Sequence, residues 1–299
     1  MRTAPAMHGA DPALFVHGLG GSAVNWTDLM DQLSRPGPLG PDSPVLAGEA
    51  VDLPGFGYSP APPDGDYSFA ARVAVVTELI EKRGNWPVHL IGNSMGGAIA
   101  TRVAARRPDL VRTLTLISPA LPDLRPRPLP MRLALVSTPG VGRILMNRLL
   151  RLPAAQRADL TITDLYADPG GMEPQRRAEA VAEVVRRDGL GYATDALLAS
   201  GRAMVAEYFR WGPTTLWRDA ARVTAPVLVI HGSHDRLVDP ANAGRAARTF
   251  RSAKVVVLPR TGHVAMMERP GQVAAEMRDF IETADATAPG GRRRAERVG

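Results

Sequence analysis

The segment Val-His-Leu-Ile-Gly-Asn-Ser-Met-Gly-Gly, residues 88–97, contains the pattern Gly-x-Ser-x-Gly around Ser94. An apolar run precedes this serine and a segment with helical spacing follows it, which is the context of a nucleophile elbow, a sharp strand-to-helix turn that exposes a hydroxyl. Gly92 and Gly96 stand where a side chain would collide with the neighbouring strand or helix. The pattern alone is weak evidence, because a chain with 29 glycines contains it by chance in about one case in ten. The assignment of Ser94 as a nucleophile therefore depends on its partners.

A serine hydroxyl needs a general base, and histidine, with an ordinary pKa near 6.5, can both take and return a proton. The chain has six histidines. His263 follows the apolar run at 254–258 and can lie over the elbow, so we predict it as the base. The other five have different expected places. His8 is in the amino-terminal segment, His17 in the glycine-rich turn and His89 on a buried strand, and the loop after residue 230 contains His231 and His234.

The base needs an acidic partner that fixes its tautomer, and in this chain order the acid precedes the histidine. Asp235 follows the apolar run Pro-Val-Leu-Val-Ile-His-Gly, and we predict it as this acid. Asp239 is a rival whose place suits a helix cap, and Asp123 is a more distant alternative. His231, His234 and Asp235 could also suggest a metal site, but a third convincing ligand is missing and no metal is expected.

Acyl transfer also needs backbone N–H groups aimed at the oxygen of the tetrahedral intermediate. The first apolar run is followed by His-Gly-Leu-Gly-Gly-Ser, in which Gly18 and Gly20 allow the backbone to approach a substrate closely. We predict the amides of Leu19 and Met95 as the two donors, with Gly20 as the rival of Leu19. His17 is expected to support this loop. A phosphate-binding interpretation is disfavoured, because the loop lacks a Lys-Ser/Thr ending and the dinucleotide spacing.

Six short apolar runs end at Gly, Pro or Asp, and helical segments lie between most of them. Runs without alternation are typical of strands that are buried on both faces of a parallel sheet. Alternation of strands and helices predicts an α/β fold, a mostly parallel sheet flanked by helices. The expected strands are 13–16, 49–52, 88–92, 113–117, 226–231 and 254–258, and the expected helices are 26–33, 70–83, 95–106, 241–250 and 271–283.

No convincing strand occurs from about 121 to 213, where a proline-rich entry precedes segments with helical spacing. We interpret this stretch as a helical cap or lid, because sites in open α/β sheets form at the carboxyl ends of the strands. Its Leu-, Val- and Met-rich part, 133–150, fits an acyl pocket or an interfacial lid, or helices that only pack on one another. The predicted units are a core of 1–120 and 214–283, a lid of 121–213 and a disordered basic tail of 284–299.

Composition narrows the classes of function. The chain has 299 residues and no cysteine, which excludes disulfide scaffolds, cysteine nucleophiles and thiolate metal sites. It has no apolar run of about 18 residues and no apolar core of a secretory signal near its start, so we expect a cytoplasmic protein without stable membrane insertion. Half of the net charge of +6 lies in the last eight residues, and no nucleic-acid partner is expected. The oligomeric state stays open.

The motifs HGLGGS, DLPGFGYS, GNSMGG, HGSHDRLVDP and GHVAMMERP, taken in order, resemble those of the α/β-hydrolase superfamily from about residue 14 to residue 283. That superfamily usually carries an antiparallel hairpin before the His-Gly loop. Only about a dozen residues precede the first run here, so we expect the hairpin to be shortened or absent. The resemblance implies a nucleophile, an acid, a base and two oxyanion donors: Ser94, Asp235, His263, Leu19 and Met95.

The resemblance implies a serine hydrolase that cleaves carboxylic esters through an acyl-enzyme, with a small-molecule acyl or ester substrate and no cofactor. The elbow is also similar to that of meta-cleavage-product hydrolases, which break carbon–carbon bonds, but a tryptophan commonly follows their base where Val264 stands here. Ser94 separates the chain from epoxide hydrolases and haloalkane dehalogenases, which use Asp at the elbow. A carbon–carbon hydrolase, a cofactor-free haloperoxidase and a ligand-binding receptor on the same fold stay open as alternatives.

Overall fold

The computed structural model describes residues 1–3, 9–37, 40, 43–84, 87–123, 125 and 127–287. Its centre is a seven-stranded sheet in the order β1-β3-β2-β4-β5-β6-β7. Neighbouring strands are parallel except for the two-residue strand β1, which is antiparallel to β3. The predicted α/β fold is thus confirmed, with one short antiparallel strand at the β3 edge. The strands are β1 (Arg2–Thr3), β2 (Asp11–Val16), β3 (Leu46–Val51), β4 (Val88–Asn93), β5 (Val111–Ile117), β6 (Val227–Gly232) and β7 (Ala253–Leu258).

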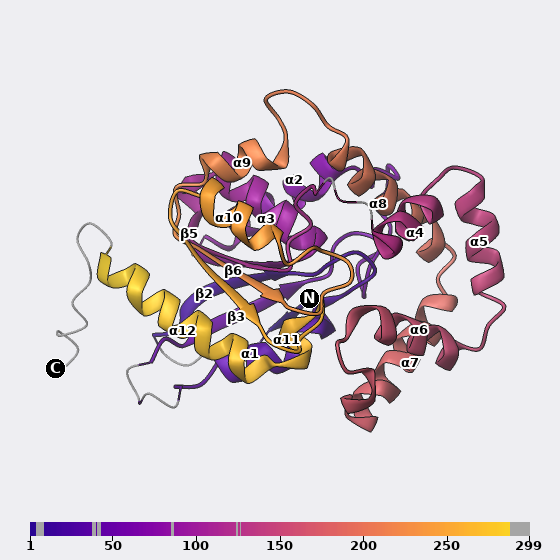
Figure 1. The fold of residues 1–299 in the computed structure, drawn as a ribbon, viewed down its shortest axis with the longest axis horizontal. Coiled ribbons are helices and arrows are strands. Elements are labelled where there is room, and N and C mark those ends of the chain that lie inside the picture. Colours follow the sequence, from indigo (N-terminus) through magenta and orange to yellow (C-terminus); the bar gives the residue numbers. More distant parts are fainter. Residues whose placement is uncertain are drawn as a thin grey trace.

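Helices cover both faces of the sheet, which is why every residue of the central strands β4 and β6 is buried (Figure 1). One apolar cluster lies between the sheet and the helices α2 (Phe69–Arg83), α3 (Met95–Arg106), α9 (Leu216–Arg222) and α10 (Asn242–Thr249). A second cluster lies between the opposite face and α1 (Thr27–Leu33), α11 (Ala265–Glu268) and α12 (Pro270–Thr287). The described residues also form short 3-10 helices at Ala23–Trp26 and Pro108–Leu110, and a further one at Pro169–Gly171, between α6 (Ala154–Leu165) and α7 (Pro174–Asp188).

Local signals set the ends of α2, the helix that leads to the elbow strand. The Ser68 hydroxyl accepts a hydrogen bond from the Ala71 amide at 3.1 Å, which caps the first turn. At the other end, Gly84 takes a left-handed conformation with φ 69°. Glycine adopts that conformation without a steric penalty and so ends the helix before β4.

The stretch between β5 and α9 contains five helices, α4 (Pro128–Val136), α5 (Val141–Leu149), α6 (Ala154–Leu165), α7 (Pro174–Asp188) and α8 (Ala193–Tyr208). They lie together beside the sheet, with α5 at the outer edge of the molecule in Figure 1. We call residues 121–213 the insertion. None of the described helices combines the length and the apolar character that a membrane crossing requires.

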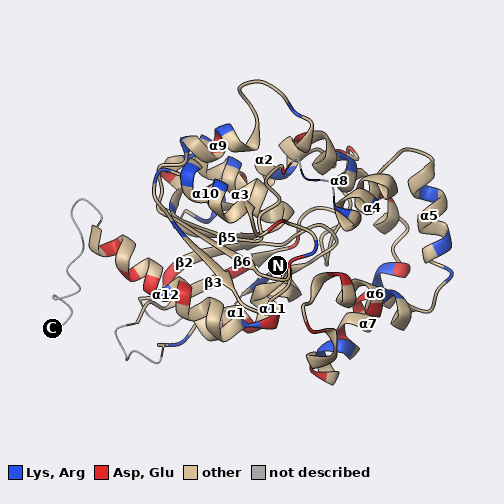
Figure 2. Cartoon of the chain, viewed as in Figure 1, with Lys and Arg blue, Asp and Glu red and all other residues tan. Residues whose placement is uncertain are grey.

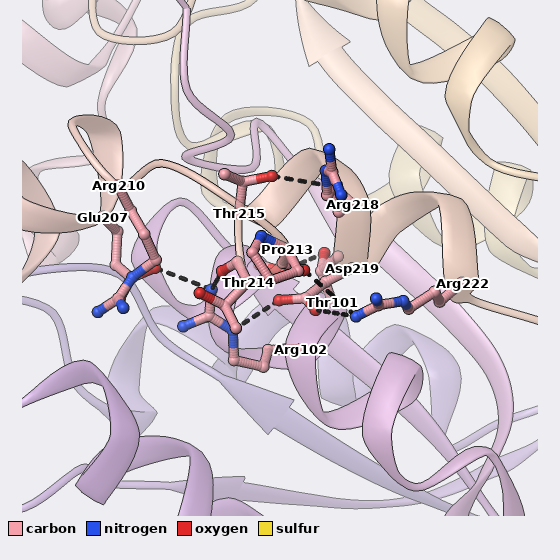
Figure 3. Close-up of polar contacts among 11 residues, drawn as sticks. Thr101, Arg102, Glu207, Arg210, Pro213, Thr214, Thr215, Arg218, Asp219 and Arg222 are labelled. Atoms are coloured by element: carbon pink, nitrogen blue, oxygen red, sulfur yellow. Dashed lines mark hydrogen bonds and ion pairs between the residues drawn. The ribbon is translucent and has the colours of Figure 1, made fainter.

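A buried ion-pair network joins the end of the insertion to the helix that follows the elbow (Figure 3). The Arg102 guanidinium, on α3, donates to Asp219 at 2.6 Å and to Glu207 at 2.8 Å. It also donates to the Thr214 carbonyl at 2.9 Å. Both carboxylates are almost fully buried, and Arg102 lies between them, while Arg210 pairs with Glu207 and Arg222 with Asp219. The arginines together offset the cost of removing the two negative charges from water. The network fixes where the chain returns from α8 to the core.

Several predicted boundaries differ from the structure; β3 begins at Leu46, three residues before the expected start at 49. Helix α12 continues to Thr287, four residues beyond the expected end at 283, because Ala284 still packs against the core and is only 8% exposed. The predicted tail therefore cannot begin at 284, and its remainder, 288–299, lies outside the described residues. Helices α6 and α9 were not predicted; α9 has only seven residues, and α6 buries only Ala158 and Ile162, so neither has a long apolar stripe in the sequence.

Candidate active site

Ser94 occupies the turn between β4 and α3 with φ 52° and ψ −118°. A non-glycine residue in this region is strained by roughly 1–3 kcal/mol, and the surrounding chain must hold it there. The Ser94 amide donates to the Ile117 carbonyl at 3.1 Å, and its carbonyl accepts from Ala120 at 2.9 Å. A β-carbon at Gly92 would overlap the carbonyl of Gly96. The glycine prediction at the elbow is therefore explained by close backbone packing.

Asp235 and His263 lie together, although 28 residues separate them in sequence. Asp235 follows β6 and His263 follows β7, and Nδ1 of the ring lies 2.9 Å from Oδ2 of the carboxylate. The other oxygen, Oδ1, accepts from the amides of Leu237 and Val238 at 2.8 and 2.9 Å. Both side chains are buried. The arrangement leaves the ring's second nitrogen, Nε2, for another partner.

The electrostatics of the pair favour an ionised carboxylate. Burial by itself raises the pKa of Asp235. The facing imidazole of His263 and the hydrogen bonds from that ring and from Val238 outweigh burial, so the pKa lies below its ordinary value. A carboxylate that is ionised and fully hydrogen-bonded can hold one tautomer of the ring and stabilise its protonated form.

Asn93, the residue before Ser94, links the elbow to the loop of His263. The Asn93 side-chain amide donates to the His263 carbonyl at 3.2 Å and to the Ile117 carbonyl at 3.0 Å. In the described part of the chain, the Ser94 hydroxyl makes no hydrogen bond with the His263 ring. Such catalytic bonds are often long until a substrate binds. The structure thus places the elbow and the His263 loop against each other without joining the hydroxyl to the ring.

The His-Gly loop after β2 lies directly beside the elbow. A β-carbon at Gly18 would lie 3.1 Å from the Ser94 side chain, and Gly20 has φ 73°. Among the described residues, the amides of Leu19 and Met95 find no acceptor; Met95 is the first residue of α3. Unpaired amides at a helix start and in a glycine-rich loop suit a developing negative charge.

His17 holds this loop and is not placed for proton transfer. The Leu53 amide donates to Nε2 at 3.0 Å, so the ring proton is on Nδ1, which donates to the Gly18 carbonyl at 2.7 Å. Burial lowers the pKa of His17 to about 4, which keeps the ring neutral. The Asp52 carboxylate, after β3, similarly holds the start of the 3-10 helix Ala23–Trp26 by accepting a hydrogen bond from the Ala23 amide at 2.7 Å.

Three groups near the site were missed by the sequence analysis. Glu268 on α11 accepts from the Gly262 amide at 2.7 Å and from the Ala167 amide at 2.9 Å, and so joins the His263 loop to the insertion. The His263 amide itself donates to the Leu165 carbonyl at 2.7 Å. Arg187 on α7 donates to the Gly20 carbonyl at 3.1 Å. No sequence signal identifies these contacts, because each depends on how the insertion packs on the core.

The rival residues have other roles or surroundings. Asp239 accepts from the Ala241 amide at 2.9 Å, as a cap before α10. Asp123 pairs with Arg127 at 3.2 Å. Burial lowers the pKa of His231 to about 4, and His234 lies at the surface beside Ser233. Within the described residues, no group of three or more His, Asp or Glu side chains could hold a metal ion. His8 lies outside the described residues.

The sequence from residue 11 to residue 270 matches the family described as alpha/beta hydrolase fold. The chain belongs to this family. The match includes the elbow, both loops that carry Asp235 and His263, and the whole insertion. The resemblance inferred from the sequence motifs is thereby confirmed.

Characterised relatives of the chain include several kinds of hydrolase. It is 28% identical to a 2-hydroxymuconate semialdehyde hydrolase of Pseudomonas putida, over 92% of this chain and 88% of that one. It is 27% identical to an esterase of Mycobacterium tuberculosis, over 92% and 84%. It is also 28% identical to the dihydrolipoyllysine-residue acetyltransferase component of an acetoin cleaving system of P. putida. The chain spans 64% of the length of that relative. The hydrolases and esterases among these relatives support the prediction of a hydrolase.

A solved structure supports the fold. A meta-cleavage product hydrolase of Pseudomonas fluorescens superimposes with a TM-score of 0.72 at 17% identity, over 92% of each chain. At this identity the likeness concerns the fold alone.

Proposed function

We propose that the protein is a serine hydrolase that cleaves carboxylic esters through an acyl-enzyme, with Ser94 as nucleophile, His263 as base and Asp235 as the acid that orients it. The observation that carries the proposal is the Asp235–His263 pair at 2.9 Å beside an elbow that holds Ser94 at φ 52°. A strained serine next to a buried carboxylate–imidazole pair has little structural use, since neither feature is needed for the sheet.

In the proposed reaction, Nε2 of His263 takes the Ser94 proton as the hydroxyl oxygen attacks the ester carbonyl. The amides of Leu19 and Met95 bind the oxyanion, and losing one such donor typically raises the barrier by about 2.7–4 kcal/mol. The protonated ring, stabilised by Asp235, then gives its proton to the leaving alcohol. A water molecule activated by the same ring releases the acid and restores the hydroxyl.

We further propose that the insertion forms a lid over the site, with residues 121–213 as the helical unit. The support is local: the carbonyl of Leu165 binds the His263 amide, and Arg187 binds the loop of Leu19 at Gly20. The insertion therefore contacts both loops that the reaction needs. A small-molecule acyl or ester substrate would bind between the insertion and the elbow.

Carbon–carbon hydrolysis is the second candidate, because a 2-hydroxymuconate semialdehyde hydrolase is among the relatives. The same nucleophile, base and oxyanion donors would serve it. Val264 favours ester cleavage over carbon–carbon cleavage, because this small buried side chain stands directly after the proposed base, where meta-cleavage-product hydrolases commonly have a tryptophan. It offers no indole N–H to a diketone substrate.

A fluorophosphonate probe tests the nucleophile, followed by p-nitrophenyl esters of graded chain length and a ring-fission diketone. We expect labelling and ester turnover, both lost in Ser94→Ala. Ser34→Ala is the matched control, because its hydroxyl only caps α1 by donating to the Asp31 carbonyl at 2.9 Å. Turnover of the diketone without ester turnover would favour the second candidate. Absence of labelling in the folded protein would reject both and favour a receptor.

A further inference from the structure

The helical hairpin of α4 and α5, residues 128–152, exposes an unusual amount of apolar surface. Of the fourteen large hydrophobic side chains that are exposed in the described residues, seven belong to this hairpin. Met131 is 59% exposed and Ile144 is 58% exposed. Helix α4 has no buried residue at all. The seven side chains are Met131, Leu133, Leu135, Val141, Ile144, Leu150 and Leu152.

The same surface is strongly basic. Residues 128–152 contain four arginines and no Asp or Glu, and one of the four, Arg143, pairs with Asp195. In Figure 2, α5 carries positions coloured for Lys or Arg and none coloured for Asp or Glu, and it lies at the edge of the molecule. Arg132, Arg148 and Arg151 are exposed and pair with no carboxylate of the described chain. Their charge is therefore available to a partner.

We propose that the α4–α5 hairpin is a docking surface for anionic lipid bilayers, on which it lies in the plane of the interface. Aliphatic side chains interleaved with arginines match a surface that is apolar below and negatively charged above. Each helix has only nine residues, so the hairpin can rest in the headgroup region without spanning it. Apolar side chains insert while the arginines bind phosphate groups.

Two other occupants fit less well. A second copy of the chain, paired about a two-fold axis, would bring the arginines of one hairpin against those of the other, which repels. A single-stranded nucleic acid would match the charge but not the apolar side chains. Residues 128–152 contain no Phe, Tyr or Trp on which bases could stack.

The hairpin also adjoins the roof of the candidate site. A β-carbon at Gly201 on α8 would overlap the Ser137 hydroxyl at the end of α4 and would lie 4.0 Å from the Leu19 side chain. A bilayer bound at α4 would therefore lie one helix away from the predicted oxyanion loop. The docking proposal does not depend on the proposed reaction, and its test uses no enzymatic assay.

The test is sedimentation of the full chain with vesicles of phosphatidylcholine alone and with 30% phosphatidylglycerol. We expect binding to the anionic vesicles only, weakened by added salt, because exposed charges are screened. Replacing Arg132, Arg148 and Arg151 together by Gln should lower the partition coefficient on the order of 100-fold, at about fivefold for each arginine. Ile144→Ser should lower it further while leaving the salt dependence unchanged.

The matched control replaces by Gln three exposed arginines on core helices that lie away from the α4–α5 hairpin in Figure 1: Arg106 on α3, Arg218 on α9 and Arg248 on α10. It carries the same loss of charge and should keep most of the binding. Circular dichroism melting confirms that each variant is folded. Equal binding to neutral vesicles would overturn the proposal. So would equal losses in both triple variants, retained binding of the hairpin variant through the basic residues 292–297, or a dimer in sedimentation velocity that Ile144→Ser abolishes.

Discussion

Replacement of Asp235 by Asn separates the fold of the site from its chemistry. The Asn side-chain carbonyl can still accept from the amides of Leu237 and Val238, which now lie 2.8 and 2.9 Å from Oδ1. The other end becomes an NH₂ group facing Nδ1 of His263. Because the Asn NH₂ group can only donate a hydrogen bond, Nδ1 has to be the acceptor, and the ring is expected to adopt the tautomer with its proton on Nε2. In that form it cannot take the proton of Ser94.

The expected loss follows from two contributions. A carboxylate about 4 Å from the centre of an imidazolium stabilises it by about 4 kcal/mol at an effective dielectric constant of 20. Restoring the active tautomer against the NH₂ group costs about another 1–2 kcal/mol, the value of one lost hydrogen bond. Together they raise the barrier by roughly 5–6 kcal/mol, which corresponds to about 10⁴-fold in kcat. KM should change little, because the carboxylate does not touch the substrate.

The assay is steady-state hydrolysis of the best p-nitrophenyl ester, together with the rate of fluorophosphonate labelling. Asp239→Asn is the matched control, since that residue has the same carboxylate, caps α10 through the Ala241 amide at 2.9 Å and otherwise faces Arg125 at 3.8 Å. Urea unfolding should give similar stabilities for both variants. A loss of less than tenfold in Asp235→Asn would refute the assignment. So would a control variant that loses as much.

Three further predictions concern the groups around the site. Glu268→Gln leaves either the Ala167 or the Gly262 amide without an acceptor and should lower kcat roughly tenfold. Glu276→Gln is the control and should leave kcat unchanged, because Glu276 pairs with Lys254. Arg102→Leu removes the buried cation between Glu207 and Asp219, which keep only their outer partners Arg210 and Arg222, and should destabilise the fold by about 3–5 kcal/mol in thermal unfolding. Arg107→Gln, at the surface, should change the melting temperature far less. Acidification to pH 5 should lower the free energy of urea unfolding by roughly 2 kcal/mol for each histidine whose pKa burial lowers to about 4, because the unfolded state takes up protons below pH 6.5 while the folded state does not. This stability is present above pH 6.5, and three residues carry it: His17, His89 and His231.

The parallel strands were predictable because their surroundings leave a simple trace in the sequence. A strand covered on both faces has no polar side, so β4 and β6 appear as mostly apolar runs in which polar residues do not alternate with apolar ones. The edge strand β1 has only two residues, both exposed, and carries no such trace. Helix α9 also escaped prediction, although its start is marked by Thr215, whose hydroxyl accepts from the Arg218 amide at 3.4 Å.

The candidate site was predictable where chain order and residue type decide it. Glycines around Ser94 indicate a sharp turn, and a buried strand end indicates where Asp235 and His263 emerge. What could not be predicted is the set of contacts made by the insertion. Glu268 is a charged residue in a short helix, and nothing in its surroundings in sequence shows that two amides 101 and 6 residues away converge on it.

Those contacts bear on what the insertion does. The loop of His263 is held by the Leu165 carbonyl at 2.7 Å, and the loop of Leu19 is held at Gly20 by Arg187 at 3.1 Å. A cover that only excluded water would not need to bind the two loops that carry the proposed base and one proposed oxyanion donor. Because catalytic groups lose much of their effect when displaced by about 1 Å, any movement of α6 or α7 would change the reaction geometry as well as access. The insertion is therefore best regarded as part of the machinery that sets the positions of these loops.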